Sequence, residues 1–291
     1  MLVRQALVLL SALSLVACSS VPAPVSTAVF KAVELPAELS ESSGLLCIGN
    51  EFISFNDSGG LPELYRINAE GKILQRLKLM TKNIDWEAIT TDGQFLYLAD
   101  IGNNAGQRSS LYIHKIPLDW RFLKQPYQPV TLEISLPQQS GLKAHQHDFD
   151  FEALVYQQGA LYLFSKSWAS EKTVLYRLDP HSQQQALGVA LPLQSPDFLV
   201  TDATFDSFTE QWWLVGYTHP FKAIWAYLIG SGFQAQIARY DARLQLQQVQ
   251  PLPTQGQVEG LCIDEMRQIW ISEEASQQKP ARLIKTGLST G

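Results

Sequence analysis

Short runs in which apolar and polar residues alternate recur along the chain from residue 42 to its end. Each of five such runs follows a quartet of residues that are mostly small, acidic or apolar. The quartets begin at Ser42, Trp86, Phe151, Thr201 and Val258, and the runs are centred on Ile53, Tyr97, Tyr162, Trp213 and Trp270. Alternation with a period of two predicts β-strands, and the recurring spacing between quartet and run predicts five similar units.

Further short strands follow in each unit. The third runs are Leu64–Ile67, Leu111–Ile113, Leu175–Leu178, Ile237–Tyr240 and Arg282–Ile284. A fourth run, such as Ile73–Leu79, follows in the first four units, with turn residues between the strands. Four antiparallel strands in each of several repeated units are typical of β-propeller blades. The fifth unit lacks its fourth strand, which Phe30–Leu35 can supply and so close the ring.

The sequence therefore predicts an all-β fold, a single β-propeller with five four-stranded blades and an N-terminal strand that closes the last blade. Six blades are the alternative, because the second and fourth units are long. A β-sandwich with coincidental repeats is a further alternative. Helix should be scarce, and the one candidate is the aromatic-rich segment 220–229.

The first residues have the pattern of an export signal. Arg4 precedes the apolar stretch Ala6–Ala17, which is too short to span a bilayer. Leu15-Val16-Ala17-Cys18 resembles the lipobox of bacterial lipoproteins, in which the cysteine is acylated. A secreted protein in which Cys18 is incidental is the alternative. We expect a signal peptide over 1–17, a lipidated tether over 18–28 and the propeller over 29–291, anchored in the cell envelope as an outer-membrane lipoprotein.

Composition narrows the class of protein further. Hydrophobic residues make up 46% of the chain, enough for a large core, and the 17% of charged residues excludes a disordered chain or a coiled coil. A net charge of −6 argues against a nucleic-acid partner. We also expect the protein to be a monomer. Cys47 and Cys262 form either a disulfide or two buried thiols, and the sequence leaves both open.

Acidic residues gather where a propeller brings one end of its strands together. The first strand of each blade lines the axis, so the start of the first strand and the end of the second emerge on the same face. The starts hold Glu87, Glu152, Asp202 and Glu259, with Ser43 in the fifth place and Glu41, Asp85, Asp150 and Gln257 two residues earlier. The ends hold Asn56-Asp57, Asp100 with Asn103-Asn104, Ser165-Lys166, Gly216-Tyr217 and Glu273-Glu274.

Carboxylates that converge on an axis repel one another, and a hard divalent cation relieves this repulsion. Carboxylate and amide oxygens suit calcium, which we expect as the cofactor. The predicted metal ligands are Asp57, Asp100, Asn103, Asn104, Glu87, Glu152, Glu259 and Glu273. Three cationic or titratable residues that break the repeat, Arg108, Lys166 and His219, are the predicted ligand-binding residues. The alternative is that the repeated carboxylates accept backbone N–H groups of the neighbouring blade and hold the ring together.

Another polar cluster, His145–Glu152, precedes the third unit. Its two imidazoles alternate with carboxylates and could bind zinc, with His219 as the plausible third histidine. A solvated loop is the alternative interpretation of the same residues.

A family resemblance rests on five segments. Glu41–Leu45, Asn56–Gly59, Asp85–Ile89 and Asp100–Asn104 look like the blade motifs of secreted bacterial propellers of the phytase-like group, and Asp150–Leu154 is similar to their acidic blade-opening motif. The resemblance covers about residues 35–285. It implies calcium-dependent phosphohydrolases with six blades, and the related lactonase-type propellers hold one axial divalent cation. This chain differs in showing five units and few cations that could hold phosphate.

These observations lead to two hypotheses of different classes. The first is an envelope-anchored propeller that binds a divalent cation and a small polar or anionic ligand on its acidic axial face, with calcium-dependent hydrolysis of a phosphoester or ester as its activity. The second is a scaffold without catalysis, which binds a protein or an envelope polymer through the same face and the aromatic residues Phe221, Trp225 and Tyr227.

Overall fold

A computed structural model of the protein describes residues 30–137, 141–191, 193–218, 233–277 and 279–290. The expectations for the signal peptide, the anchor Cys18, the tether, His219 and the segment 220–229 lie outside these residues. Strands dominate the described part, whose one helical segment is the short 3-10 turn η1 (Ala37–Leu39). None of its helices is long and apolar enough to cross a membrane.

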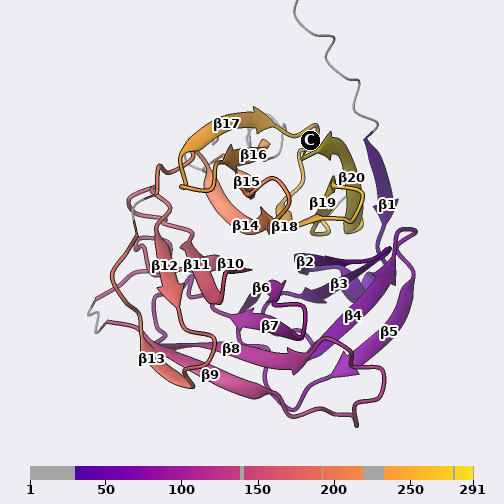
Figure 1. Ribbon diagram of the computed structural model, residues 1–291, viewed down its shortest axis with the longest axis horizontal. Helices are drawn as coiled ribbons and strands as arrows, with labels where there is room; N and C mark the ends of the chain where they lie inside the picture. Colours follow the sequence, from indigo (N-terminus) through magenta and orange to yellow (C-terminus); the bar gives the residue numbers. More distant parts are fainter. Residues whose placement is uncertain (1–29, 138–140, 192, 219–232, 278, 291) are drawn as a thin grey trace, which may run out of the picture.

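Five small sheets surround a common axis as the blades of a propeller (Figure 1). Blade 1 holds β2 (Ser42–Ile48), β3 (Glu51–Asn56), β4 (Glu63–Asn68) and β5 (Ile73–Lys78). Blade 2 holds β6 (Trp86–Thr91), β7 (Phe95–Asp100), β8 (Ser110–Pro117) and β9 (Val130–Ser135). Blade 3 holds β10 (Phe151–Gln157), β11 (Ala160–Ser165) and β12 (Leu175–Leu178). Blade 4 holds β14 (Leu199–Asp206), β15 (Gln211–Tyr217), β16 (Ala235–Tyr240) and β17 (Leu246–Pro251). Blade 5 holds β18 (Val258–Ile263), β19 (Gln268–Glu273), β20 (Arg282–Ser289) and β1 (Lys31–Glu34). The prediction of five blades is confirmed.

The hydrophobic core is divided among the blade interfaces. The inner strands β2, β6, β10, β14 and β18 each contact the next, and β18 contacts β2 again. Five clusters of buried apolar side chains lie between successive blades, one at each interface. Successive side chains of a strand point to opposite faces of its blade, and each face packs against a neighbouring blade. Inner strands are therefore buried along almost their whole length.

Blade 3 differs from the four-stranded pattern. It has three strands, because β13 (Gln184–Ala186) pairs in parallel with β9 and makes blade 2 five-stranded. The next residue, Leu187, is buried in the cluster between blades 2 and 3. Burial of this side chain holds the segment at the edge of β9, although Gln184 and Gln185 offer little apolar surface of their own.

Two features close the ring between blades 5 and 1. The N-terminal strand β1 pairs antiparallel with β20, in the register Lys31 to Lys285 and Glu34 to Arg282, as the sequence predicted. Cys47 on β2 forms a disulfide with Cys262 on β18, which settles the question that the sequence left open. Blades 1 and 5 are thus joined by a covalent bond between their inner strands as well as by the added outer strand.

Candidate metal centre at the acidic end of the ring

A β-bulge lies near the start of every inner strand. The pairing between inner and second strand shifts by one residue at Glu87, Glu152 and Glu259, and similar shifts occur at Ser43-Gly44 and at Thr201. A bulge leaves the extra residue out of the ladder and changes the direction of its side chain. The bulges thus explain how three glutamates of three blades come to lie at one end of the ring, here called the acidic end.

The bulge of blade 4 corrects the sequence alignment by one residue. Thr201, and not Asp202, occupies the position equivalent to Glu87. Asp202 is buried, and its carboxylate accepts the N–H of Ala203 at 2.8 Å and the N–H of Leu261 in blade 5 at 2.7 Å. Asp202 therefore holds blade 4 to blade 5 through a backbone N–H group, as the alternative interpretation of the repeated carboxylates predicted.

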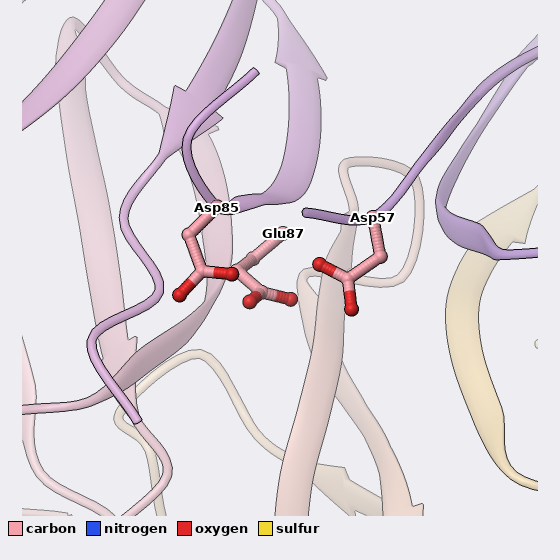
Figure 2. A group of neighbouring side chains, drawn as sticks. All are labelled: Asp57, Asp85 and Glu87. Atoms are coloured by element: carbon pink, nitrogen blue, oxygen red, sulfur yellow. The ribbon is translucent and has the colours of Figure 1, made fainter. Parts of the chain in front are cut away.

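Three carboxylates from blades 1 and 2 converge at the acidic end. Asp57 follows β3, Asp85 precedes β6, and Glu87 is the bulged residue of β6. One oxygen of each lies within 4.8 Å of the others, and Figure 2 shows Glu87 between the two aspartates. Glu87 is 4% exposed, and Asp57 and Asp85 are half-buried. Together they form a candidate metal site, here called the three-carboxylate cluster.

Backbone contacts hold this cluster in place. The side-chain amide of the buried Asn83 donates to the carbonyl oxygens of Asn56 and Asp57 at 2.8 and 2.7 Å, which joins the end of β3 to the start of β6. Gly102 packs against the other side, so closely that a Cβ there would lie 2.3 Å from Glu87 Oε1 and 2.4 Å from Asp85 Oδ2. Only glycine at this position leaves room for the carboxylates of Asp85 and Glu87.

The electrostatics of the cluster favour a bound cation. Burial first, and then the charge of Asp57, raise the pKa of Asp85 to about 7. Burial also raises the pKa of Glu87, helped by Glu152 and Asp57, and that of Asp57 itself. In the described part of the chain none of these three carboxylates forms an ion pair with lysine, arginine or histidine. Without a cation the cluster must hold protons near neutral pH.

Lys166 follows β11, and its charge acts at the acidic end on Asp57 and Glu87, where it counteracts the rise of their pKa values. Its Nζ is 3.1 Å from Glu152 Oε1, and both side chains are almost completely buried. Burial alone would lower the pKa of Lys166, but Glu152, Tyr217 and Glu259 raise it well above the usual value. This predicted ligand-binding residue is therefore already engaged with a carboxylate of the same face.

Four other predicted site residues form the loop after β7 instead of joining the cluster. Arg108 forms an ion pair with Asp100, with 2.7 Å between Nη1 and Oδ1, and donates to the carbonyl oxygen of Gly102 at 2.9 Å. Asn103 accepts the N–H of Arg108 and donates its side-chain amide to Phe149. The carbonyl oxygen of Asn104 faces His147 Nε2 at 3.3 Å. These contacts shape the loop that carries Gly102 to the cluster.

Glu273 also lies outside the cluster. Its carboxylate accepts hydrogen bonds from Arg282 and Thr254, and it is 2% exposed. Asp150 accepts the N–H of Asn103 at 2.6 Å and the indole N–H of Trp168 at 2.7 Å, which joins blade 3 to blade 2. Both carboxylates are satisfied by protein donors and hold neighbouring segments together.

The structure favours a structured loop over a zinc site at residues 145–148. His147 is buried, its Nδ1 accepts the N–H of Phe149 at 3.1 Å, and its Nε2 faces the carbonyl oxygen of Asn104. His145 packs edge-on against Trp168 with 4.7 Å between ring centroids. Asp148 accepts the N–H groups of Ala169 and Ser170, each at 3.0 Å. Both ring nitrogens of His147 are thus engaged within the protein.

Asp85 and Glu274 were not among the predicted ligands, although the structure gives both a place near the cluster. Asp85 belongs to the cluster, and Glu274 lies close enough that Glu259 and Asp57 act on it; burial first, and then these charges, raise the pKa of Glu274 to about 8. The sequence did contain a signal for Asp85, because a residue two places before Glu87 on a strand points the same way.

Comparisons with known proteins give similar solved structures but no family. No protein-family model matches the chain, and a search of curated proteins also gives no match. A hypothetical protein from Leishmania major is 11% identical over 88% of this chain and 89% of its own, with a TM-score of 0.50.

Two further solved structures are similar at a lower score. A catalytically inactive virginiamycin B lyase from Staphylococcus aureus with quinupristin is 14% identical over 86% of this chain and 68% of its own, with a TM-score of 0.41. A luciferin-regenerating enzyme is 10% identical over 88% of this chain and 95% of its own, with a TM-score of 0.45. Both are β-propeller proteins. The sheets of this chain make it a five-bladed β-propeller protein, and its three-carboxylate cluster could hold a metal ion.

Proposed function

We propose that this protein is an envelope-anchored lipoprotein whose acidic end binds one calcium ion and, through that ion, a small anionic ligand. The observation that carries the proposal is the three-carboxylate cluster, whose members converge without an ion-pair partner among the described residues. Buried carboxylates that lack a counter-ion either take up protons or bind a cation.

The spacing of the cluster suits calcium. Calcium binds oxygen ligands at about 2.3–2.6 Å, so two oxygens on opposite sides of the ion are about 4.8 Å apart. The cluster meets this limit, since its oxygens lie within 4.8 Å of one another. Calcium takes about six to eight oxygens, and three side chains therefore leave positions for water and for oxygens of a ligand. An ion held in this way would attract the phosphate or carboxylate oxygens of a small molecule.

Hydrolysis of a phosphoester or an ester is the activity that such a site would support. A bound cation polarises a phosphoryl or carbonyl oxygen and makes a coordinated water more acidic. The chain's own contribution would be to hold the ion through Asp57, Asp85 and Glu87. The test is the release of 4-nitrophenol from 4-nitrophenyl phosphate and 4-nitrophenyl acetate, with calcium and with chelator. Calcium binding without turnover of either ester would favour a binding protein without catalysis.

Calcium binding itself is tested by titration calorimetry on chelator-treated protein. We expect one calcium ion per chain, and a gain of about 2.7 kcal/mol in folding free energy when free calcium is near 100 times Kd. Asp57→Asn and Asp85→Asn should each weaken binding strongly, because each removes a charged ligand. Glu70→Gln is the matched control, since Glu70 is exposed in the turn between β4 and β5. Wild-type protein that binds neither calcium, magnesium, manganese nor zinc would contradict the proposal.

The envelope location is tested separately through Cys18. If the lipobox-like segment directs acylation, Cys18→Ser should move the protein from the membrane fraction to the soluble fraction. Replacing the neighbouring Ser20 with alanine is the control and should leave the fractionation unchanged. An unchanged distribution of the Cys18→Ser variant would contradict the lipid anchor without affecting the calcium site.

A further inference from the structure

The charges at the acidic end are divided between two sides. Asp57, Asp85 and Glu87 come from blades 1 and 2, and no side-chain cation among the described residues pairs with them. Lys166 forms an ion pair with Glu152 of blade 3, and its charge acts more strongly than any other favourable charge on Glu259 of blade 5. The same charge also acts on Asp57 and Glu87, but it forms no ion pair with them. Two groups of carboxylates thus share one end of the ring, and one of them already has a positive charge.

Lys166 is placed as a bound cation would be. Its Nζ lies 3.1 Å from Glu152 Oε1, and the two side chains are 6% and 3% exposed. The ring of Tyr217 from blade 4 and the ring of Trp168 lie 5.3 and 5.2 Å from the same nitrogen. Aromatic faces at this distance stabilise a cation. The ammonium group is therefore held by blades 3 and 4 in a water-poor position at the acidic end.

Glu259 supplies a second, independent sign of a cation position. It is the bulged residue of β18 and is 4% exposed. Its Oε1 is buried and has no hydrogen-bond partner among the described residues. The charge of Lys166 is the strongest favourable charge that acts on Glu259. A buried carboxylate oxygen without a donor is costly, and the neighbouring ammonium group compensates part of that cost.

We infer that Lys166 is a built-in counter-ion that occupies one of two cation positions at the acidic end and so limits the protein to a single metal ion on the side of blades 1 and 2. The second position is formed by Glu152 and Glu259, and its occupant in the native protein is the ammonium group. This inference rests on the proposed calcium site for the position of the metal ion, but the role of Lys166 has a test of its own.

The test is the number of calcium ions bound by Lys166→Met. The methionine side chain is close to lysine in length and carries no charge, so Glu152 and Glu259 lose their counter-ion. We expect titration calorimetry and elemental analysis to show two calcium ions per chain in this variant and one in the wild type. Lys166→Arg keeps the charge and is the matched control, which should bind one. The double variant Lys166→Met/Glu152→Gln removes a ligand of the new position and should return to one.

The possible outcomes separate this inference from the proposed function. One calcium ion in Lys166→Met, or none, would overturn the role of Lys166, provided that the wild type binds one. If the wild type binds none, the proposed calcium site fails. One ion in Lys166→Met would then still support Lys166 as the counter-ion of the second position, and no ion in Lys166→Met would overturn that role as well. Should Lys166→Met not fold, Lys166→Gln, which can still donate a hydrogen bond to Glu152, is measured in the same way. A single ion in that variant would also overturn the inference.

Discussion

Gly102→Ala should remove calcium binding while the propeller still folds. The backbone of Gly102 lies outside the left-handed region, so alanine can adopt its conformation. The added methyl group would lie 2.3 Å from Glu87 Oε1 and 2.4 Å from Asp85 Oδ2. Ordinary contact needs about 3.4 Å, so these carboxylates must move by about 1 Å. A movement of this size displaces two of the three ligands of the cluster, and overpacking of this kind costs about 1–3 kcal/mol of stability.

Calorimetry and thermal unfolding, each with and without calcium, measure the effect. We expect at least a tenfold loss of calcium affinity, equal to about 1.4 kcal/mol, and a melting temperature that no longer responds to calcium. Gly188→Ala is the matched control, because a Cβ at Gly188 would meet no atom within 4 Å and its backbone is also outside the left-handed region. If Gly102→Ala bound calcium as the wild type does, the metal ion would not lie at the three-carboxylate cluster.

Three other predictions concern the stability of the ring. Removing the disulfide by Cys47→Ser/Cys262→Ser should lower the free energy of unfolding by about 5 kcal/mol, because the bond closes a loop of 215 residues. Reductant should lower the melting temperature of the wild type and leave that of the variant unchanged. Deleting residues 30–36 should lower the melting temperature of the whole domain, because β1 covers β20 and Leu35 is buried between blades 5 and 1; a melting temperature equal to that of the intact protein would contradict this. Without calcium, stability should fall as pH rises from about 4 to 8, because the folded protein holds protons on Asp85 and Glu274, with pKa values of about 7 and 8, that the unfolded chain has already released. Calcium should remove the part of this fall that comes from Asp85, which belongs to the cluster, and melting curves in which pH has the same effect with and without calcium would contradict the linkage.

The five blades could be predicted because each contains its own local pattern. Strand alternation and the recurring quartets need no knowledge of distant residues, and the N-terminal strand followed from the missing outer strand of blade 5. The place of β13 could not be predicted. Its two glutamines carry no periodic signal, and its pairing with β9 depends on the burial of Leu187 between two blades. The disulfide likewise depends on which inner strands meet when the ring closes.

The sequence predicted which end of the ring carries the candidate site, but not which residues contact one another there. Sequence placed the acidic residues at one end of the ring, and Asp57 and Glu87 lie in the cluster there. Preference for residues that break the repeat selected Asp100 and Asn103, which the structure uses to fix the loop after β7. Asp85 was passed over as a repeated position. Which carboxylates find a donor depends on bulges and on loop contacts between blades, and neither leaves a mark in the local sequence.

The direction of β1 has a consequence for how the protein meets its surroundings. Glu34 pairs with Arg282, which begins β20 at the acidic end, so β1 runs toward that end and begins nearer the opposite one. A chain that is tied to a lipid surface upstream of β1 would therefore approach the propeller from the side away from the carboxylates. If the proposed lipid anchor is present, the proposed metal site would lie at the end of the ring away from the point where the tether joins it, where dissolved solutes could reach it directly.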